Sequence, residues 1–192
     1  MEDREHHEGW FYEGTVPGSR HGNIEHGFKI QDLIYKGRSD FQEVLIFDNP
    51  VYGRVLVLDG IVQLSTTDEF VYHEMLVQPV MLSHPDPKRV LIIGGGDGGT
   101  LREVLRHHPD QVVMIDLDKT VAELSQHHLP GLSEGGFQHP NLELVHEDAS
   151  VWVRRYSNHF EVAIIDCNDA VGPSMPLFEA PFYEDVARAT SS

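Results

Sequence analysis

Short apolar runs separated by turn residues dominate the first part of the chain. Strand-like patterns, with Asn-Pro and Asp-Gly turn signals between some of them, cover residues 27–37, 40–49, 53–58 and 61–65. Strands this close in sequence pair as hairpins, so we expect a small antiparallel sheet. Residues 68–82 then show apolar positions near helical spacing, and Pro79 should end or kink that helix.

The pattern changes after the Ser-His-Pro-Asp-Pro breaker at residues 83–87, which predicts one domain over 1–84 and a second over 85–192. Apolar runs now alternate with helical segments, as in βαβ units. We expect strands at residues 90–93, 111–116, 142–146 and 162–166. We expect helices at about residues 99–107, 118–128, 149–156 and 181–189. The continuous apolar character of these strands is typical of a parallel sheet covered on both faces.

These patterns together predict an α/β fold. It would consist of a Rossmann-like, doubly wound parallel sheet of the methyltransferase type, preceded by a small antiparallel β-hairpin domain. Such a sheet has about six strands, whereas four are recognisable here, so we expect it to be incomplete at its C-terminal side.

Composition restricts the partners and the location. The 192 residues carry a formal net charge of −17, which repels phosphate backbones and attracts polycations, so we expect no nucleic-acid partner. Only 40% of the residues are hydrophobic, no apolar run approaches a membrane span, and the charged N-terminus is unlike a secretory signal. The single cysteine, Cys167, excludes an intrachain disulfide and fits a reducing compartment. We therefore expect a cytoplasmic protein without membrane association.

Histidine spacing argues against a metal site. Six of the 13 histidines form three adjacent pairs, whose side chains diverge on a helix. His73 and Glu74 begin like the HExxH motif, but Val77 replaces the second histidine ligand. We therefore expect no metal site.

The strongest local motif is glycine-rich. The first predicted parallel strand runs into Gly94, Gly96 and Gly99 and then into a helix, which gives GxGxxG in its usual context. Asp116 ends the next strand, where a carboxylate can accept both ribose hydroxyls of an adenosine. Asp97 lies where pyrophosphate oxygens would otherwise sit, so the loop favours a cationic nucleoside, such as an adenosyl sulfonium, over NAD. A structural turn, and acids that only cap the following helices, remain the alternatives.

Several further motifs carry a resemblance to a known family. GGGDGG is accompanied by GWF, DGIVQ, DEFVYHEM, the acid of MIDLD, EDA and DCNDAVGP, in this order from Gly9 to about Tyr183. In these motifs the chain resembles the spermidine synthase family of polyamine aminopropyltransferases, apparently truncated at the C-terminus. The resemblance implies transfer of an aminopropyl group from decarboxylated S-adenosylmethionine to putrescine, which yields spermidine and methylthioadenosine. It implies a homodimer and no permanently bound cofactor.

The same resemblance implies roles for individual residues. Those that would bind the nucleoside co-substrate are Gln42, Gln63, Gly94, Gly96, Asp97, Asp116, Asp148, Ala149 and Pro173. Those that would bind the polyamine substrate or the reacting groups are Trp10, Tyr72, His73, Asp97, Asp166 and Asp169. Asp166 would act as the catalytic acceptor, with Tyr72 beside it.

Elementary chemistry agrees with these roles. An alkylammonium has a pKa near 10.4, so the acceptor amine is protonated at neutral pH and cannot attack carbon until it loses that proton. A carboxylate at a strand end can remove the proton directly or through water. The departing thioether is neutral and needs no general acid. The neighbouring Cys167 should be a small buried residue with a raised pKa rather than a nucleophile.

Four positions depart from the family pattern: Ala170 replaces a proline, Met175 and Pro176 replace a small residue and an acid, and Asp116 replaces a glutamate. Two other hypotheses about the function remain open. One is a putrescine N-methyltransferase that uses intact S-adenosylmethionine. The other is a non-catalytic fragment or regulatory subunit. The acceptor could be putrescine, cadaverine, agmatine or spermidine.

Overall fold

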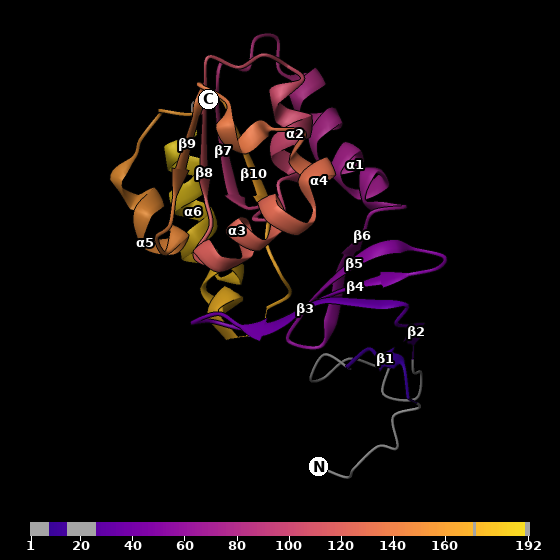
Figure 1. Ribbon diagram of the computed structural model, residues 1–192. Helices are drawn as coiled ribbons and strands as arrows, with labels where there is room; N and C mark the ends of the chain where they lie inside the picture. The colour runs from indigo at the N-terminus through magenta and orange to yellow at the C-terminus, as the bar shows by residue number, and fades with distance from the viewer. Residues whose placement is uncertain (1–7, 15–25, 171, 191–192) are drawn as a thin grey trace. The chain divides into compact units, whose positions relative to one another are not determined.

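The computed structural model describes residues 8–14, 26–170 and 172–190 (Figure 1). The chain divides into two compact units, Met1–Glu69 and Phe70–Ser192. Each unit has its own sheet and its own hydrophobic core.

The first unit is antiparallel. It contains a two-stranded pair, β1-β2, and a four-stranded sheet in the order β3-β4-β5-β6. Their bounds are β1 Trp10–Tyr12, β2 Gly27–Lys29, β3 Asp32–Arg38, β4 Glu43–Asn49, β5 Gly53–Leu58 and β6 Ile61–Ser65. Phe47, Val55 and Val57 are fully buried on one side of the sheet, and Phe11 and Phe28 pack against them. The predicted antiparallel hairpin domain is confirmed.

The single strand predicted over residues 27–37 is wrong in detail. The structure divides it into β2 and β3, because the two parts pair with different strands: β2 with β1 and β3 with β4. The backbone N–H of Ile30 donates to Gly9 and that of Gln31 donates to Asp48, which marks the change of partner.

The β5–β6 hairpin turns at Asp59 and Gly60, whose φ angles are 48° and 78°. Two successive positive φ values match the right-handed twist of the flanking strands, which explains the Asp-Gly pair at this position. The Asp59 carboxylate also accepts a hydrogen bond from the Glu43 backbone N–H at 2.8 Å. The turn therefore connects β5 and β6 and is also bonded to the start of β4.

The second unit contains a parallel sheet in the order β10-β7-β8-β9. The strands are β7 Arg89–Gly94, β8 Gln111–Ile115, β9 Leu142–Val145 and β10 Val162–Asp166. Chain order proceeds outward from β7 to β9 and then returns to the other side of β7 with β10. The switch point of the sheet therefore lies between the carboxyl ends of β7 and β10, where open α/β sheets bind ligands.

Helices cover both faces of this sheet (Figure 1). They are α1 Glu69–Ser83, α2 Gly99–Leu105, α3 Lys119–His128, α4 Pro130–Ser133, α5 Ala149–Trp152 and α6 Ala180–Ala189, with 3-10 turns η1 Gly136–Gln138, η2 Val153–Arg155 and η3 Gly172–Phe178. Alternate residues of β7 face opposite sides: Val90 and Ile92 pack with α1 and α2, whereas Leu91 and Ile93 pack with α5 and α6. All four are fully buried, so the predicted doubly covered parallel sheet is confirmed.

Pro79 was predicted to end or kink helix α1; it lies inside the helix and does not end it. Val77 and Met81, on either side of this proline, are both buried in the core with Val90 and Ile92. Tertiary packing therefore carries the helix through the position where Pro79 lacks a donor. The same packing places α1 with the second unit, whereas the sequence pattern had assigned it to a first domain ending at residue 84.

Two other helices are shorter than predicted. Helix α2 ends at Leu105, before His108, which has a positive φ of 54°. The segment predicted as one helix over residues 149–156 is α5 followed by the 3-10 turn η2. Trp152 and Val153, at this transition, are both buried in the core that packs against the sheet.

Strand β10 pairs along its length with β7. Two residues before β10, Phe160 forms an isolated parallel bridge with Thr190, directly after α6. No helix among the described residues has the length and apolarity needed to cross a membrane.

Candidate active site

The ends of β7 and β10 lie side by side, with Asp166 paired to Gly94. Gly94 has a φ of 83°, and a Cβ atom there would overlap the backbone carbonyl of Asp166. The N–H of the next residue, Gly95, donates to that carbonyl at 2.8 Å. Glycine is therefore required at position 94, and its absence of a side chain brings the glycine loop against Asp166.

Two hydroxyl groups hold the Asp166 carboxylate. The Tyr72 hydroxyl of α1 donates to Oδ1 at 2.9 Å, and the Thr100 hydroxyl of α2 donates to Oδ2 at 2.6 Å. Burial and, next, the negative charge of Asp97 raise the pKa of Asp166. A raised pKa makes this carboxylate a stronger base than an exposed aspartate, while the two hydroxyls fix its orientation.

Tyr72 acts here as a hydrogen-bond donor. Burial of the phenol, followed by the charge of Asp166, raises the pKa of Tyr72 above its ordinary value. The hydroxyl therefore stays protonated at neutral pH. Burial likewise raises the pKa of Cys167 to about 11, with Asp166 as the second cause, so this thiol is not a nucleophile at neutral pH, as predicted.

His73 and Asp97 form a second pair at this end of the sheet. His73 Nε2 lies 3.3 Å from Asp97 Oδ1, and the side chain of His73 is only 2% exposed. Asp97 Oδ1 also accepts from the backbone N–H of Gly99 at 2.7 Å. One ligand atom each from His73, Asp97 and Asp166 lies within 4.8 Å of the others. Two carboxylates this close attract a cation, and either a metal ion or an ammonium group satisfies that requirement.

Gly99 makes room for the His73 ring. A Cβ atom at position 99 would overlap ring atoms of His73, which has no free space because it is buried and paired with Asp97. We expect Gly99→Ala to lower the free energy of unfolding by about 1–3 kcal/mol through overpacking. Urea denaturation measures this change.

Gly131 in α4 is the matched control for that substitution, because a Cβ atom there meets nothing within 4 Å. We expect Gly131→Ala to be neutral or stabilising by up to about 1 kcal/mol. Equal losses of stability in the two variants would show that the His73 ring does not restrict position 99.

Asp116 follows β8 and faces the glycine loop. Its Oδ1 accepts from the N–H of Asp118 at 2.8 Å, and its carboxylate also bonds the backbone of Gly96. Burial raises the pKa of Asp116 to about 6 despite these hydrogen bonds. The N-cap of α3 is Asp118, whose carboxylate accepts from Thr120. The alternative that Asp116 itself caps this helix is therefore wrong.

Asp148 lies at the corresponding place after β9 and does cap a helix. Its Oδ1 accepts from the Ser150 backbone N–H at 2.8 Å and from the Ser150 hydroxyl at 2.7 Å. Ala149 is the first residue of α5. Helix capping is a sufficient reason for an aspartate at position 148, whether or not a ligand binds there. A role of Asp148 and Ala149 toward adenine therefore stays a prediction.

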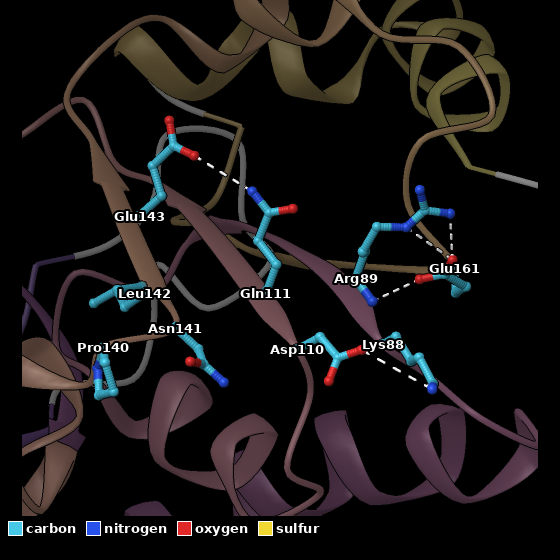
Figure 2. A pocket seen from close by; sticks show the side chains of 9 residues that line it. All are labelled: Lys88, Arg89, Asp110, Gln111, Pro140, Asn141, Leu142, Glu143 and Glu161. Carbon is cyan, nitrogen blue, oxygen red and sulfur yellow. Dashed lines mark hydrogen bonds and ion pairs between the residues drawn. The ribbon is translucent and has the colours of Figure 1, made fainter.

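A cavity of about 710 Å³ lies at the opposite end of the sheet (Figure 2). It is lined by the starts of the strands and the loops before them: Lys88, Arg89, Asp110, Gln111, Pro140, Asn141, Leu142, Glu143 and Glu161. Arg89 is held by Glu161, and Lys88 lies 3.3 Å from Asp86 and 4.0 Å from Asp110. Ligands of open α/β sheets bind at the carboxyl ends, so we assign the candidate site to Asp97, Asp116 and Asp166 instead.

Comparison with models of protein families identifies the family of the chain. Residues 69–192 match the spermine/spermidine synthase domain, and residues 9–66 match the spermidine synthase tetramerisation domain. The chain belongs to the spermidine synthase family. The resemblance inferred from the sequence motifs is thereby confirmed.

Individual relatives agree with the family assignment. The chain is 45% identical over 170 residues to a polyamine aminopropyltransferase of Pectobacterium atrosepticum. The aligned region covers 88% of this chain and 59% of the relative. It is also 45% identical to polyamine aminopropyltransferase 1 of Aquifex aeolicus, over 86% of this chain and 59% of the relative. This member of the spermidine synthase family therefore spans about 59% of the length of these curated relatives.

Solved structures show the same fold. A spermidine synthase in complex with the transition-state analogue AdoDATO matches with a TM-score of 0.90 and 40% identity, over 99% of this chain and 63% of that one. The spermidine synthase of Thermotoga maritima matches with a TM-score of 0.85 and 39% identity, over 99% of this chain and 61% of that one.

Five further predicted site residues come from other segments of the chain. Trp10, Gln42 and Gln63 belong to the first unit: Trp10 lies in β1 and is 42% exposed, Gln42 precedes β4, and Gln63 lies in β6. In the second unit, Asp169 is exposed in the segment after β10, and Pro173 lies in η3. Their roles toward substrates of the spermidine synthase reaction stay predictions.

Thr100 is the site residue that sequence reasoning missed. It binds Asp166 directly, yet it directly follows the glycine motif as an ordinary helix residue. Its position in the sequence could have predicted this contact, because the first turn of the helix after β7 faces the neighbouring strand at the switch point.

Proposed function

We propose that this chain is the catalytic part of a polyamine aminopropyltransferase that transfers aminopropyl from decarboxylated S-adenosylmethionine to putrescine. The observation that supports this proposal most is the grouping of Asp97 and Asp166 with Tyr72 and His73 at the switch point. Two carboxylates there suit a reaction in which both substrates are cationic. At 4 Å and an effective dielectric constant near 20, each opposite-charge pair offsets about 4 kcal/mol of repulsion.

Asp166 is the proposed general base. It takes a proton from the acceptor ammonium, directly or through water, and the freed nitrogen lone pair attacks the carbon bonded to the sulfonium sulfur. The new C–N bond forms as the C–S bond breaks, and the bonding electrons pass to sulfur, which leaves as neutral methylthioadenosine. Asp166 then releases the proton to solvent.

Asp97 and Asp116 would fix the sulfonium donor. Asp97 pairs with the primary ammonium of the aminopropyl arm, and Asp116 accepts the two ribose hydroxyls. His73, buried and paired with Asp97, orients that carboxylate. Such positioning supplies a large part of the rate, because the lone pair must align with the carbon–sulfur bond. Among the remaining predictions, Asp148 and Ala149 would meet adenine, Gln42 and Gln63 the nucleoside, and Trp10 and Asp169 the diamine.

The donor distinguishes this proposal from a putrescine N-methyltransferase. With labelled putrescine, we expect labelled spermidine from decarboxylated S-adenosylmethionine and no labelled product from intact S-adenosylmethionine. Chromatography with radioactive detection measures both products. Transfer of methyl but never of aminopropyl would contradict the proposal.

A stably folded chain with no turnover is the remaining alternative. A thermal shift on adding methylthioadenosine, without transfer from either donor, would indicate a non-catalytic nucleoside-binding chain. The match of residues 9–66 to a tetramerisation domain supports assembly of several copies, and the homodimer predicted from the sequence is one such assembly. The cytoplasmic location stays a prediction from the sequence.

A further inference from the structure

Helix α2 carries a completely buried carboxylate that the proposed mechanism does not use. The side chain of Glu103 is 0% exposed. Its Oε1 lies 2.8 Å from Arg102 Nε and 2.9 Å from Arg106 Nη1. Its Oε2 accepts from Arg106 Nη1 at 3.0 Å. A buried charge is tolerated only with such partners, and two guanidinium groups already supply them.

A further hydrogen bond links this carboxylate to α1. Gln78 Nε2 donates to Glu103 Oε2 at 2.9 Å. The other end of the same amide lies close to the end of α2, with Gln78 Oε1 2.8 Å from His107 Nε2. One end of the Gln78 amide therefore joins α1 to α2, and the other joins α1 to the segment just after α2.

The two helices joined in this way are the ones that hold Asp166. Tyr72 and Gln78 share α1, about 9 Å apart along the helix axis at 1.5 Å per residue. Thr100 and Glu103 share α2 and are separated by about one turn. Any sliding of α1 along α2 by about 1 Å would stretch the Tyr72–Asp166 hydrogen bond while Thr100 kept its own.

We propose that Gln78, through its bond to Glu103, is a positioning residue that sets where α1 lies along α2 and so keeps the Tyr72 hydroxyl on Asp166. Its effect on turnover rests on the proposed function, whereas its effect on Tyr72 does not. Charge compensation of Glu103 is not its purpose, since Arg102 and Arg106 remain when the amide is removed.

The test is Gln78→Leu in the complete chain with 3-fluorotyrosine at its tyrosines. The fluorine resonance of Tyr72 is assigned by its loss in Tyr72→Phe, and Asp166→Ala gives its position without the hydrogen bond. We expect the Tyr72 resonance of Gln78→Leu to move toward the Asp166→Ala position. We also expect kcat to fall about 10–100-fold, the cost of a misplacement near 1 Å, with the Kd for methylthioadenosine within about twofold.

Gln126→Leu is the matched control. Gln126 is half-buried on α3 and bonds Ala122 and Gln138, so the same substitution breaks comparable bonds without touching α1 or α2. We expect the control to leave the Tyr72 resonance and kcat unchanged. If Gln78→Leu does not fold, Gln78→Asn, which keeps the amide but shortens its reach, decides the same question.

The outcomes separate the two proposals. An unmoved Tyr72 resonance in Gln78→Leu, or equal losses of kcat in Gln78→Leu and Gln126→Leu, would overturn the positioning role. Absence of methylthioadenosine binding and turnover in the parent chain would overturn the proposed function instead, and the fluorine resonance would still decide the role of Gln78.

Discussion

Replacing Asp166 with asparagine should lower kcat for aminopropyl transfer by about 10²–10⁴-fold, the usual contribution of a general base. Asparagine has the same shape. Its oxygen can still accept from Tyr72, and its amide can donate to the Thr100 hydroxyl, so the local geometry survives while the base is lost. Transfer measured with labelled putrescine at saturating substrate gives the change in kcat.

Binding of the nucleoside should survive this substitution. The carboxylate proposed to hold the ribose is Asp116, which bonds Gly96 and Asp118 rather than Asp166. Calorimetry with methylthioadenosine should therefore give a Kd for Asp166→Asn close to that of the parent chain.

Asp110→Asn controls for the loss of one negative charge. Asp110 is exposed immediately before β8, at the opposite end of the sheet from Asp166. We expect this control to keep full activity. Parental activity in Asp166→Asn would exclude Asp166 as the base, and an equal loss in Asp110→Asn would mean that net charge, not position, is responsible.

The sequence predicted the parallel sheet well because its strands are buried on both faces and read as continuous apolar runs. Val90 to Ile93 is such a run, and all four residues are fully buried. Prediction was poorer where packing competes with local preference. Pro79 was expected to end or kink α1, yet the helix continues past it, and Val77 and Met81 on either side of it are buried in the core.

Acids at strand ends were the part of the site that sequence could predict. Position after a strand places Asp116 and Asp166 at one end of a parallel sheet, whatever the loops do. Contacts between elements did not follow from the pattern of residues. Only the family resemblance placed Tyr72 beside Asp166, 94 positions away, and the hydrogen bond from Thr100 to Asp166 was missed. Position after a strand also does not show whether an acid caps the next helix or is available for a ligand. Asp148 is the N-cap of α5, whereas the N-cap of α3 is Asp118 and not Asp116.

Affinity for methylthioadenosine should fall about tenfold for each pH unit below about 6. Burial raises the pKa of Asp116 to about 6, so the carboxylate is ionised above this pH and protonated below it. The ribose hydroxyls both need acceptor oxygens, and a protonated carboxyl has lost one of them. The binding-competent fraction therefore decreases tenfold per pH unit below the pKa and is constant above about pH 7. Calorimetric titrations between about pH 5 and 8 measure the slope.

Stability should depend on pH in the opposite direction to binding. The pKa of Asp116 is higher in the folded chain than the reference value of 3.8, so the folded state binds this proton more tightly. Its contribution to stability is complete below about pH 4 and is lost as the pH rises through about 6. At neutral pH the buried, ionised Asp116 therefore lowers the stability of the fold. Such a cost is expected of a residue that serves binding rather than folding.

Two variants assign the slope to Asp116. Asp116→Asn should bind methylthioadenosine weakly at every pH and show no slope, because the amide does not titrate and turns an N–H₂ group toward one hydroxyl. Asp166→Asn should keep the slope of the parent chain, since it leaves Asp116 intact. A parent Kd that is constant from about pH 5 to 8 would mean that a group other than Asp116 holds the ribose, and the nucleoside would then have to be placed elsewhere along the carboxyl ends of the strands.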